Sequence, residues 1–158
     1  MGFGTGHHET TRLCLRLLQD AALADRSVLD VGTGSGVLAL AADALGAESS
    51  RGIDVDPDAI ESARENWTLN GCSPRVHFEV ADASAAGAAS DVVLANLTGA
   101  LLRRIAHQLI SVVRPGGALV ISGFQIVEAD EVLAAFAPRT SSVRTVREGD
   151  WEAALLTL

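Results

Sequence analysis

Residues 27–36, SVLDVGTGSG, constrain the fold of this chain more than any other segment. A short apolar run, interrupted only by Asp30, leads directly into three glycines at alternate positions, Gly32, Gly34 and Gly36. An Ala- and Leu-rich run over residues 37–45 follows, and that composition favours a helix. This order predicts a strand, a tight glycine turn and a helix whose free backbone N–H groups point at a ligand above the turn.

The composition favours one compact domain over residues 1–158. Hydrophobic residues make up 48% of the chain and charged residues 20%, which allows a full core. The formal net charge of −8 would repel a polyanion, so direct binding to nucleic acid is not expected. The chain has no Tyr, and all 12 of its basic residues are Arg. The absence of Lys excludes a phosphate-loop lysine, a Schiff-base lysine and a Tyr/Lys dehydrogenase pair.

Cysteine and apolar patterns indicate a reducing compartment, and we expect a cytoplasmic protein. Cys14 and Cys72 have no metal-type spacing, and no signal peptide precedes them. No apolar run reaches the roughly 18 residues that span a membrane, so no membrane association is expected. His7 and His8 precede Glu9, but neighbouring side chains point apart and no third ligand is evident, so no metal is predicted.

Hydrophobic periodicity predicts alternating strands and helices along the chain. The predicted helices cover residues 9–23, 37–45, 57–69, 101–113 and 127–136. The predicted strands cover residues 27–31, 50–53, 76–80, 91–94 and 118–122, and residues 141–146 and 152–158 form a terminal hairpin. Thr10 or Thr11 is placed to cap the first helix, and Asp56 is placed to cap the third. Residues 115–117 are predicted to end the fourth helix. The alternation predicts an α/β fold with a doubly wound parallel sheet and an antiparallel edge.

The glycine spacing and nearby acids indicate which cofactor the turn binds. Dinucleotide enzymes use Gly-x-Gly-x-x-Gly, but here Gly36 comes one position early and Val37 takes the expected place. Asp30, just before the turn, disfavours a pyrophosphate and suits a positively charged ligand such as S-adenosylmethionine. This order of residues is typical of class I methyltransferases. Asp54, after the second strand, is then predicted to accept the ribose hydroxyls, and Asp82, after the third, to bind the adenine amine unless it is only a solvated loop acid.

A more specific resemblance covers essentially the whole chain. Residues 3–11, FGTGHHETT, resemble the Phe-Gly-Thr-Gly-x-His-x-Thr-Thr signature of the methyltransferases of ribosomal protein L11. Later motifs of that family are matched in order by residues 30–36, 52–57, 95–97, 115–117, 122–123 and 148–151. The resemblance implies a Rossmann-like class I methyltransferase: a doubly wound, mostly parallel seven-stranded sheet with an antiparallel C-terminal edge strand and helices on both faces.

The resemblance also implies a set of site residues and the cofactor S-adenosylmethionine, with S-adenosylhomocysteine as product. Phe3 and Thr5 would help to close the site, and Val55 would pack on the adenine. Asn96 would be catalytic, because its carbonyl oxygen can accept an N–H bond from an incoming amine and aim the lone pair at the methyl carbon. The implied cofactor-binding residues are Phe3, Thr5, Thr11, Asp30, Gly32, Thr33, Gly34, Asp54, Val55, Asp82 and Asn96.

The sequence constrains the identity of the methyl acceptor less than that of the cofactor. The family carries an N-terminal substrate-recognition domain, whereas this chain starts at the catalytic signature, and residues 98–99 and Phe124 depart from the commonest forms. We predict an N-methyltransferase for amino groups of a protein substrate, possibly a ribosomal protein. A small-molecule methyltransferase and a cofactor-binding module that needs a partner chain stay open as alternatives. A dehydrogenase that binds NAD is the weakest rival.

Overall fold

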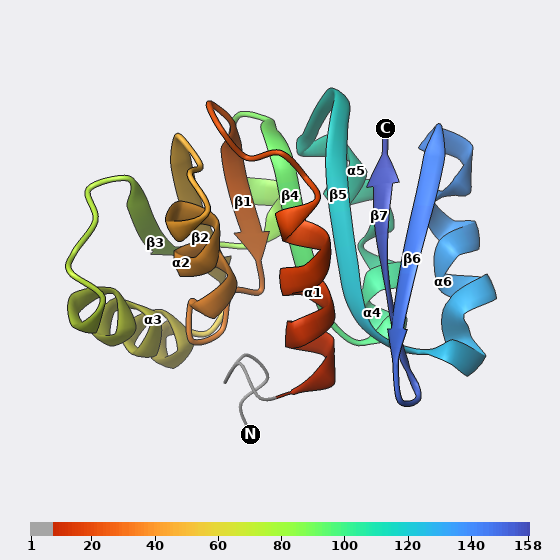
Figure 1. Cartoon of the computed structure of the whole chain (residues 1–158), viewed down its shortest axis with the longest axis horizontal. Helices are drawn as coiled ribbons and strands as arrows, with labels where there is room; N and C mark the ends of the chain where they lie inside the picture. The colour runs from red at the N-terminus through yellow and green to blue at the C-terminus, as the bar shows by residue number, and fades with distance from the viewer. Residues whose placement is uncertain (1–7) are drawn as a thin grey trace.

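The computed structural model describes residues 8–158, which form a seven-stranded sheet with helices on both faces (Figure 1). The strand order is β3-β2-β1-β4-β5-β7-β6. Strands β1 to β5 pair in parallel, and β7 pairs antiparallel with both β5 and β6. The bounds are β1 Ser27–Val31, β2 Ser49–Asp54, β3 Val76–Val80, β4 Ser90–Asn96, β5 Val113–Gln125, β6 Ser142–Glu148 and β7 Trp151–Thr157. The predicted fold class is confirmed.

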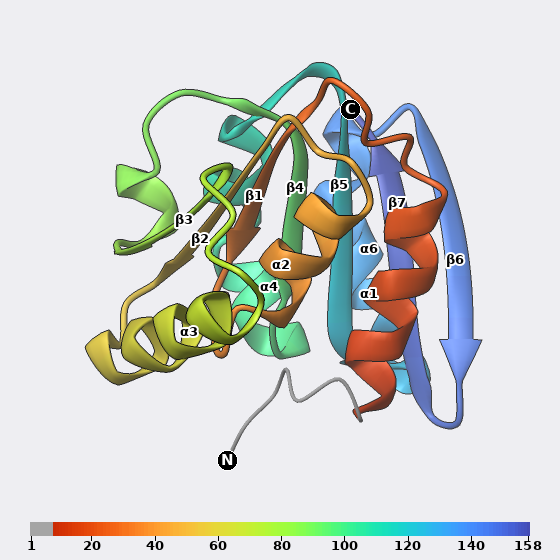
Figure 2. The same ribbon diagram turned by 60° about the vertical axis from the view of Figure 1, so that its left-hand side comes forward.

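Helices α1, α2 and α3 cover one face of the sheet, and α4, α5 and α6 cover the other (Figure 2). The α-helices are α1 Glu9–Gln19, α2 Val37–Ala44, α3 Pro57–Leu69, α4 Gly99–Arg104, α5 Ala106–Ser111 and α6 Ala129–Phe136. Short 3-10 turns lie at η1 Ala83–Ala85, η2 Ile126–Glu128 and η3 Ala137–Arg139. Within residues 8–158, no helix has the length and apolar character that crossing a membrane requires.

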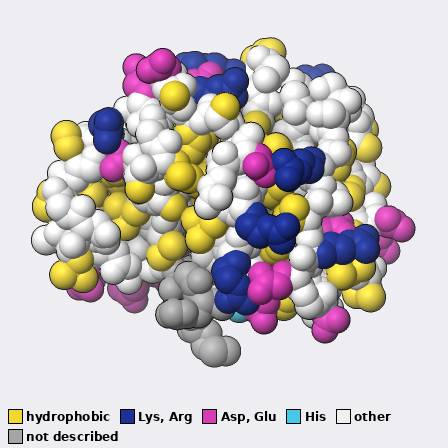
Figure 3. Space-filling view, viewed as in Figure 1, with side chains coloured by type: hydrophobic (Ala, Val, Ile, Leu, Met, Phe, Trp, Pro, Cys, Tyr) yellow, Lys and Arg dark blue, Asp and Glu magenta, His cyan; other side chains and the backbone are white. Residues whose placement is uncertain are grey.

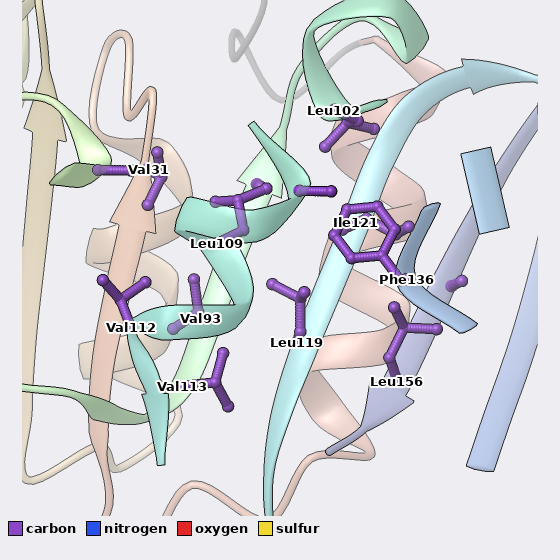
Figure 4. Packing of buried hydrophobic residues seen from close by; sticks show 14 of the residues in the cluster. Val31, Val93, Leu102, Leu109, Val112, Val113, Leu119, Ile121, Phe136 and Leu156 are labelled. Carbon is purple, nitrogen blue, oxygen red and sulfur yellow. The ribbon is translucent and has the colours of Figure 1, made fainter. Parts of the chain in front are cut away.

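Alternation along the strands assigns their side chains to the two faces. Val28 packs in the cluster under α1 and α2, whereas Leu29 and Val31 belong to the opposite cluster. That second cluster is built around residues such as Leu109 and Phe136, from α5 and α6, against the strands (Figure 4). By the same alternation Asp30 faces α1, and so do the polar residues at the ends of β4 and β5.

The predicted strand, glycine turn and helix are confirmed. Gly32, Gly34 and Gly36 all have positive φ, at 72°, 56° and 83°, a conformation that disfavours residues with a side chain. Gly36 is the N-cap of α2. A Cβ on Gly36 would lie 2.7 Å from the Phe78 ring, so this glycine also allows the turn to pack closely on β3.

The first helix is shorter than predicted and is capped differently. It ends at Gln19 rather than at residue 23, because Ala22 adopts φ 50° and Ala24 then forms a bridge with Ala47. The cap is His8, whose side chain accepts the backbone N–H of Thr10. Thr10 and Thr11 were the predicted caps, but both are fully buried inside the first turn. Asp56 caps α3 as predicted.

The segment after β4 also differs from the prediction. The predicted helix over residues 101–113 starts earlier and is broken at Ile105 into α4 and α5. Strand β5 begins at Val113, and its register against β4 shifts where residues 114–117 bulge opposite Asp91. Residues 115–117 therefore lie within a bulged strand, where Gly116 donates its N–H to the carbonyl of Leu158.

The terminal hairpin is present, with β6 at the edge and β7 inside the sheet. Glu152 of β7 is buried and pairs with Arg147. Arginine side chains gather on the face that α1 and the hairpin form (Figure 3). There, Arg12 of α1 makes a bidentate pair with Glu148 of β6. Such contacts fix α1 across the hairpin.

Candidate functional site

A cleft of about 840 Å³ opens at the carboxyl ends of β1, β2 and β4. In open α/β sheets this edge is the usual place for a ligand. Four segments line the cleft: the glycine turn, the end of β2, the η1 turn and the chain from β4 into α4 and α5. Among the lining residues are Gly32, Gly34, Asp54, Val55, Asp82, Asn96, Leu97 and Thr98.

Asp54 is held at the end of β2 by two backbone groups. One carboxylate oxygen accepts the N–H of Gly34 at 3.0 Å, and the other accepts the N–H of Asp56 at 3.0 Å. The first of these bonds ties the acid to the glycine turn across the sheet. Next to it, Val55 lines the cleft with 69% of its surface exposed, so an apolar contact is available beside a fixed carboxylate.

Asp82 lies at the start of the η1 turn. Its carboxylate accepts bonds from the hydroxyl of Ser84 and the backbone N–H of Ala85. The Ser84 hydroxyl is the main reason that the pKa of Asp82 lies below its ordinary value. The cleft therefore carries an ionised acid at this end as an acceptor of hydrogen bonds.

Asn96 ends β4 and presents an unpaired oxygen. Its side chain is 9% exposed, and its amide nitrogen donates to the hydroxyl of Thr11 at 3.4 Å. Within residues 8–158, its carbonyl oxygen Oδ1 is buried without a hydrogen-bond partner. Buried polar atoms are nearly always paired in folded proteins, so we expect a group outside the described residues, such as a ligand donor, to pair with this oxygen on a residue that lines the cleft.

Ser122 and Gly123 of β5 hold the chain that follows Asn96. The backbone oxygen of Ser122 accepts the N–H of Leu97 at 2.9 Å, and the Ser122 hydroxyl donates to the carbonyl of Thr10 at 3.0 Å. Gly123 has φ 100°, and a Cβ there would overlap the Leu97 carbonyl. Residues 122–123 were matched only as a family motif, and no site role was predicted for them from the sequence.

Asp30 and Thr33 lie behind the glycine turn, and neither lines the cleft. The Thr33 hydroxyl donates to Asp30 at 2.7 Å. Burial raises the pKa of Asp30 to about 7, helped by the nearby charge of Asp54 and opposed by the Thr33 bond. Burial, and then the charge of Asp30, also raises the pKa of Cys14 to about 12, so this thiol stays protonated.

The structure thus brings most of the predicted site residues to one place. Gly32, Gly34, Asp54, Val55, Asp82 and Asn96 line the cleft. Thr11, Asp30 and Thr33 are buried, Thr11 bonded to Asn96 and Thr33 to Asp30. Phe3 and Thr5 lie outside the described residues. Sequence reasoning missed the wall that α4 and α5 supply, Leu101, Arg104, Ile105 and Gln108, although their spacing is that of one helical face.

Comparisons with known proteins agree with this fold. The solved structure of ribosomal protein L11 methylase from Lactobacillus delbrueckii subsp. bulgaricus superimposes with a TM-score of 0.89 and 29% identity, covering 96% of this chain and 79% of that one. An RNA methyltransferase from Salinibacter ruber, solved in complex with S-adenosyl-L-homocysteine, has a TM-score of 0.74 at 23% identity over 92% of this chain and 90% of that one, a likeness of fold. Fold and cleft define a Rossmann-like methyltransferase domain.

The sequence comparisons specify the family. The family model described as Ribosomal protein L11 methyltransferase (PrmA) matches residues 1–157. A curated protein of that name from Pelobacter propionicus is 45% identical over 97% of this chain and 52% of its own length. Another from Pseudomonas aeruginosa is 42% identical over 96% of this chain and 51% of its own length. The chain belongs to the ribosomal protein L11 methyltransferase family and spans about half the length of these relatives.

Proposed function

We propose that this chain is the catalytic domain of an S-adenosylmethionine-dependent N-methyltransferase that modifies amino groups of ribosomal protein L11. The observation that carries the proposal is the unpaired Oδ1 of Asn96, on a residue that lines a cleft formed also by a glycine turn and two acids. Family membership and the names of the relatives support the same reaction.

The lining residues fit the chemistry of the cofactor. Asp54, fixed by two backbone N–H groups, would accept the ribose hydroxyls, and Asp82 would accept the adenine amine. Val55 offers an exposed apolar side chain to the adenine ring. The turn at Gly32 and Gly34 lets a ligand approach the backbone closely. When bound, the cofactor supplies an electrophilic methyl group on a cationic sulfur.

Asn96 would position the acceptor. Its unpaired Oδ1 can accept an N–H bond from an incoming amine, while its amide nitrogen stays on Thr11. An amine attacks only as the neutral base, and a free Lys amine has a pKa near 10.4, so binding here must favour the neutral form. An acceptor oxygen that stabilises an N–H group without supplying a charge is suited to orienting such an amine, with the proton lost to solvent. Orientation of the two reactants then supplies most of the rate enhancement.

Transfer of a labelled methyl group from S-adenosylmethionine tests this proposal. We expect the chain to label ribosomal protein L11. Asn96→Ala should lower kcat by about 10²-fold or more, as loss of one well-placed polar group does, and leave the Kd for S-adenosylhomocysteine within about 3-fold. The exposed Asn70→Ala is the matched control and should change neither.

Two results would contradict the proposal. Full activity of Asn96→Ala would remove the proposed positioning role. Labelling of metabolite pools but not of ribosomal protein would favour the small-molecule alternative.

A further inference from the structure

The wall of the cleft that α4 and α5 form carries two polar side chains, Arg104 and Gln108. They lie four residues apart, on the helical face that also presents Leu101 and Ile105 to the cleft. Within the described part of the chain, neither side chain has a hydrogen-bond or ion-pair partner. Neighbouring Arg103, by contrast, pairs with Glu131 at 2.6 Å. Among the lining residues that the structure describes, Arg104 is the one cation, in a chain with net charge −8.

This wall lies near Asp82. Helix α5 packs against the η1 turn, and Ala83 shares a core cluster with Ala106 and Leu109. Ile105 separates α4 from α5, and Arg104 and Gln108 both line the cleft, as do Asp82 and Ser84. The cleft therefore combines an ionised acceptor, Asp82, with the nearby donors Arg104 and Gln108.

The donors complement what an adenine ring presents. Its exocyclic amine donates, and a carboxylate such as Asp82 can accept from it. Its ring nitrogens only accept, and need a donor such as the side-chain amide of Gln108; Gln is a common partner of adenine at the amine and N7. Its π-face attracts a guanidinium.

We propose that Arg104 and Gln108 form the second wall of the adenine subsite and determine its specificity, an inference that rests on the proposed function. Gln108 supplies an N–H donor to N7 of the adenine, and Arg104 supplies a cation to the ring. The two residues select a purine with an acceptor at position seven and leave the amino-acid end of the cofactor untouched.

Calorimetric titration with S-adenosylhomocysteine and with its 7-deaza analogue tests the role of Gln108. The unmodified chain should bind the 7-deaza ligand about 3- to 10-fold more weakly, the range expected for one neutral hydrogen bond. Gln108→Ala should bind S-adenosylhomocysteine more weakly by the same factor and should no longer distinguish the two ligands. Gln108→Glu removes the donor while keeping nearly the same side-chain size, and it should behave like Gln108→Ala. A purely structural role for Gln108 would lower both affinities equally and preserve the discrimination.

The role of Arg104 has a matched control on the same helix. Arg104→Ala should weaken S-adenosylhomocysteine binding about 2- to 5-fold, the range for an exposed cation on an aromatic face. Arg103→Ala removes the same charge outside the cleft and should leave Kd unchanged.

Three results would overturn the inference: equal binding of both ligands to the unmodified chain, discrimination that survives Gln108→Ala, or an Arg104→Ala affinity equal to that of Arg103→Ala. If the unmodified chain bound neither ligand, the proposed function itself would be contradicted, which separates the two failures.

Discussion

Asn96 and Ser122 are direct neighbours in the β4–β5 ladder, and each of their side chains makes a hydrogen bond to α1. Asn96 donates to the hydroxyl of Thr11, and Ser122 donates to the carbonyl of Thr10. These two contacts therefore link α1 to the proposed acceptor end of the cleft. Because α1 carries the end of the residue 3–11 signature, that signature is connected to the cleft through buried polar groups.

Ser122→Ala should lower the free energy of unfolding by about 1–3 kcal/mol, because the buried Thr10 carbonyl loses its side-chain donor. It should also lower kcat more than it raises the Kd for S-adenosylhomocysteine, because the turn of α1 that Ser122 holds also bonds to Asn96. Urea denaturation and a methyl-transfer assay measure the two effects. Ser142→Ala, exposed on β6, is the control and should stay within about 0.5 kcal/mol. A Ser122→Ala protein as stable as the control would show that the buried bond contributes nothing.

Asp54→Asn should weaken S-adenosylhomocysteine binding about 10-fold or more. Asp54 accepts two backbone N–H groups, whereas an amide has one acceptor oxygen and must turn its NH2 toward Gly34 or Asp56. Loss of hydrogen bonds to a charged group has that magnitude. Asp58→Asn changes an exposed acid four residues along and should bind normally. Equal affinities for the two variants, measured by calorimetry, would remove Asp54 from the cofactor site.

Gly123→Ala and Gly46→Ala separate backbone strain from a steric overlap. Both glycines have φ 100°, but a Cβ on Gly46 meets nothing within 4 Å, whereas one on Gly123 overlaps the Leu97 carbonyl. We expect Gly46→Ala to lower the free energy of unfolding by roughly 1–2 kcal/mol and Gly123→Ala by about 2 kcal/mol more. Only the second change should alter S-adenosylhomocysteine binding. Identical chemical denaturation curves for the two variants would mean that Leu97 shifts freely.

Asp30 makes stability depend on pH. Its pKa is about 7 in the folded protein against an ordinary 3.8, so the folded state holds a proton that the unfolded state has released. Its contribution to stability is complete below pH 3.8, falls as pH rises, and is lost above about pH 7. Asp30→Asn keeps an acceptor for Thr33 without a charge. From pH 5 to pH 8 the unmodified chain should therefore lose roughly 2–3 kcal/mol relative to this variant, at about 1.4 kcal/mol per pH unit up to about pH 7.

Urea denaturation at the two pH values measures this difference. Glu61→Gln, an exposed acid on α3, should show no such change with pH. Parallel pH profiles for the unmodified chain and Asp30→Asn would mean that Asp30 stays ionised in the folded protein.

The strand, turn and helix around residues 27–45 were predictable because local chemistry determines them. Few residues other than glycine adopt the positive φ found at Gly32, Gly34 and Gly36. Asp54 and Asp82 come at or after the ends of parallel strands, and those ends must meet at one edge of the sheet. The features that the sequence did not reveal depend on tertiary contacts. The bulge at residues 114–117 exists because Gly116 and Gly117 bond to Leu158, far along the chain.

Within the site, Asn96 and Asp30 show the same difference between what the local sequence predicts and what depends on tertiary contacts. The position of Asn96 after a strand was visible in the sequence, but its unpaired Oδ1 depends on burial against α1. Asp30 was predicted from the motif to face the charge of a ligand. Strand alternation and a bond to Thr33 place it behind the turn, and its contact with cofactor stays a prediction.

A calorimetric titration of the unmodified chain with S-adenosylhomocysteine tests most directly whether the cleft is the cofactor site of a methyltransferase. We predict saturable binding at one site per chain, weakened by Asp54→Asn and retained by Asn96→Ala, with no comparable binding of NAD. Absence of binding at millimolar S-adenosylhomocysteine, or selective binding of NAD, would contradict it.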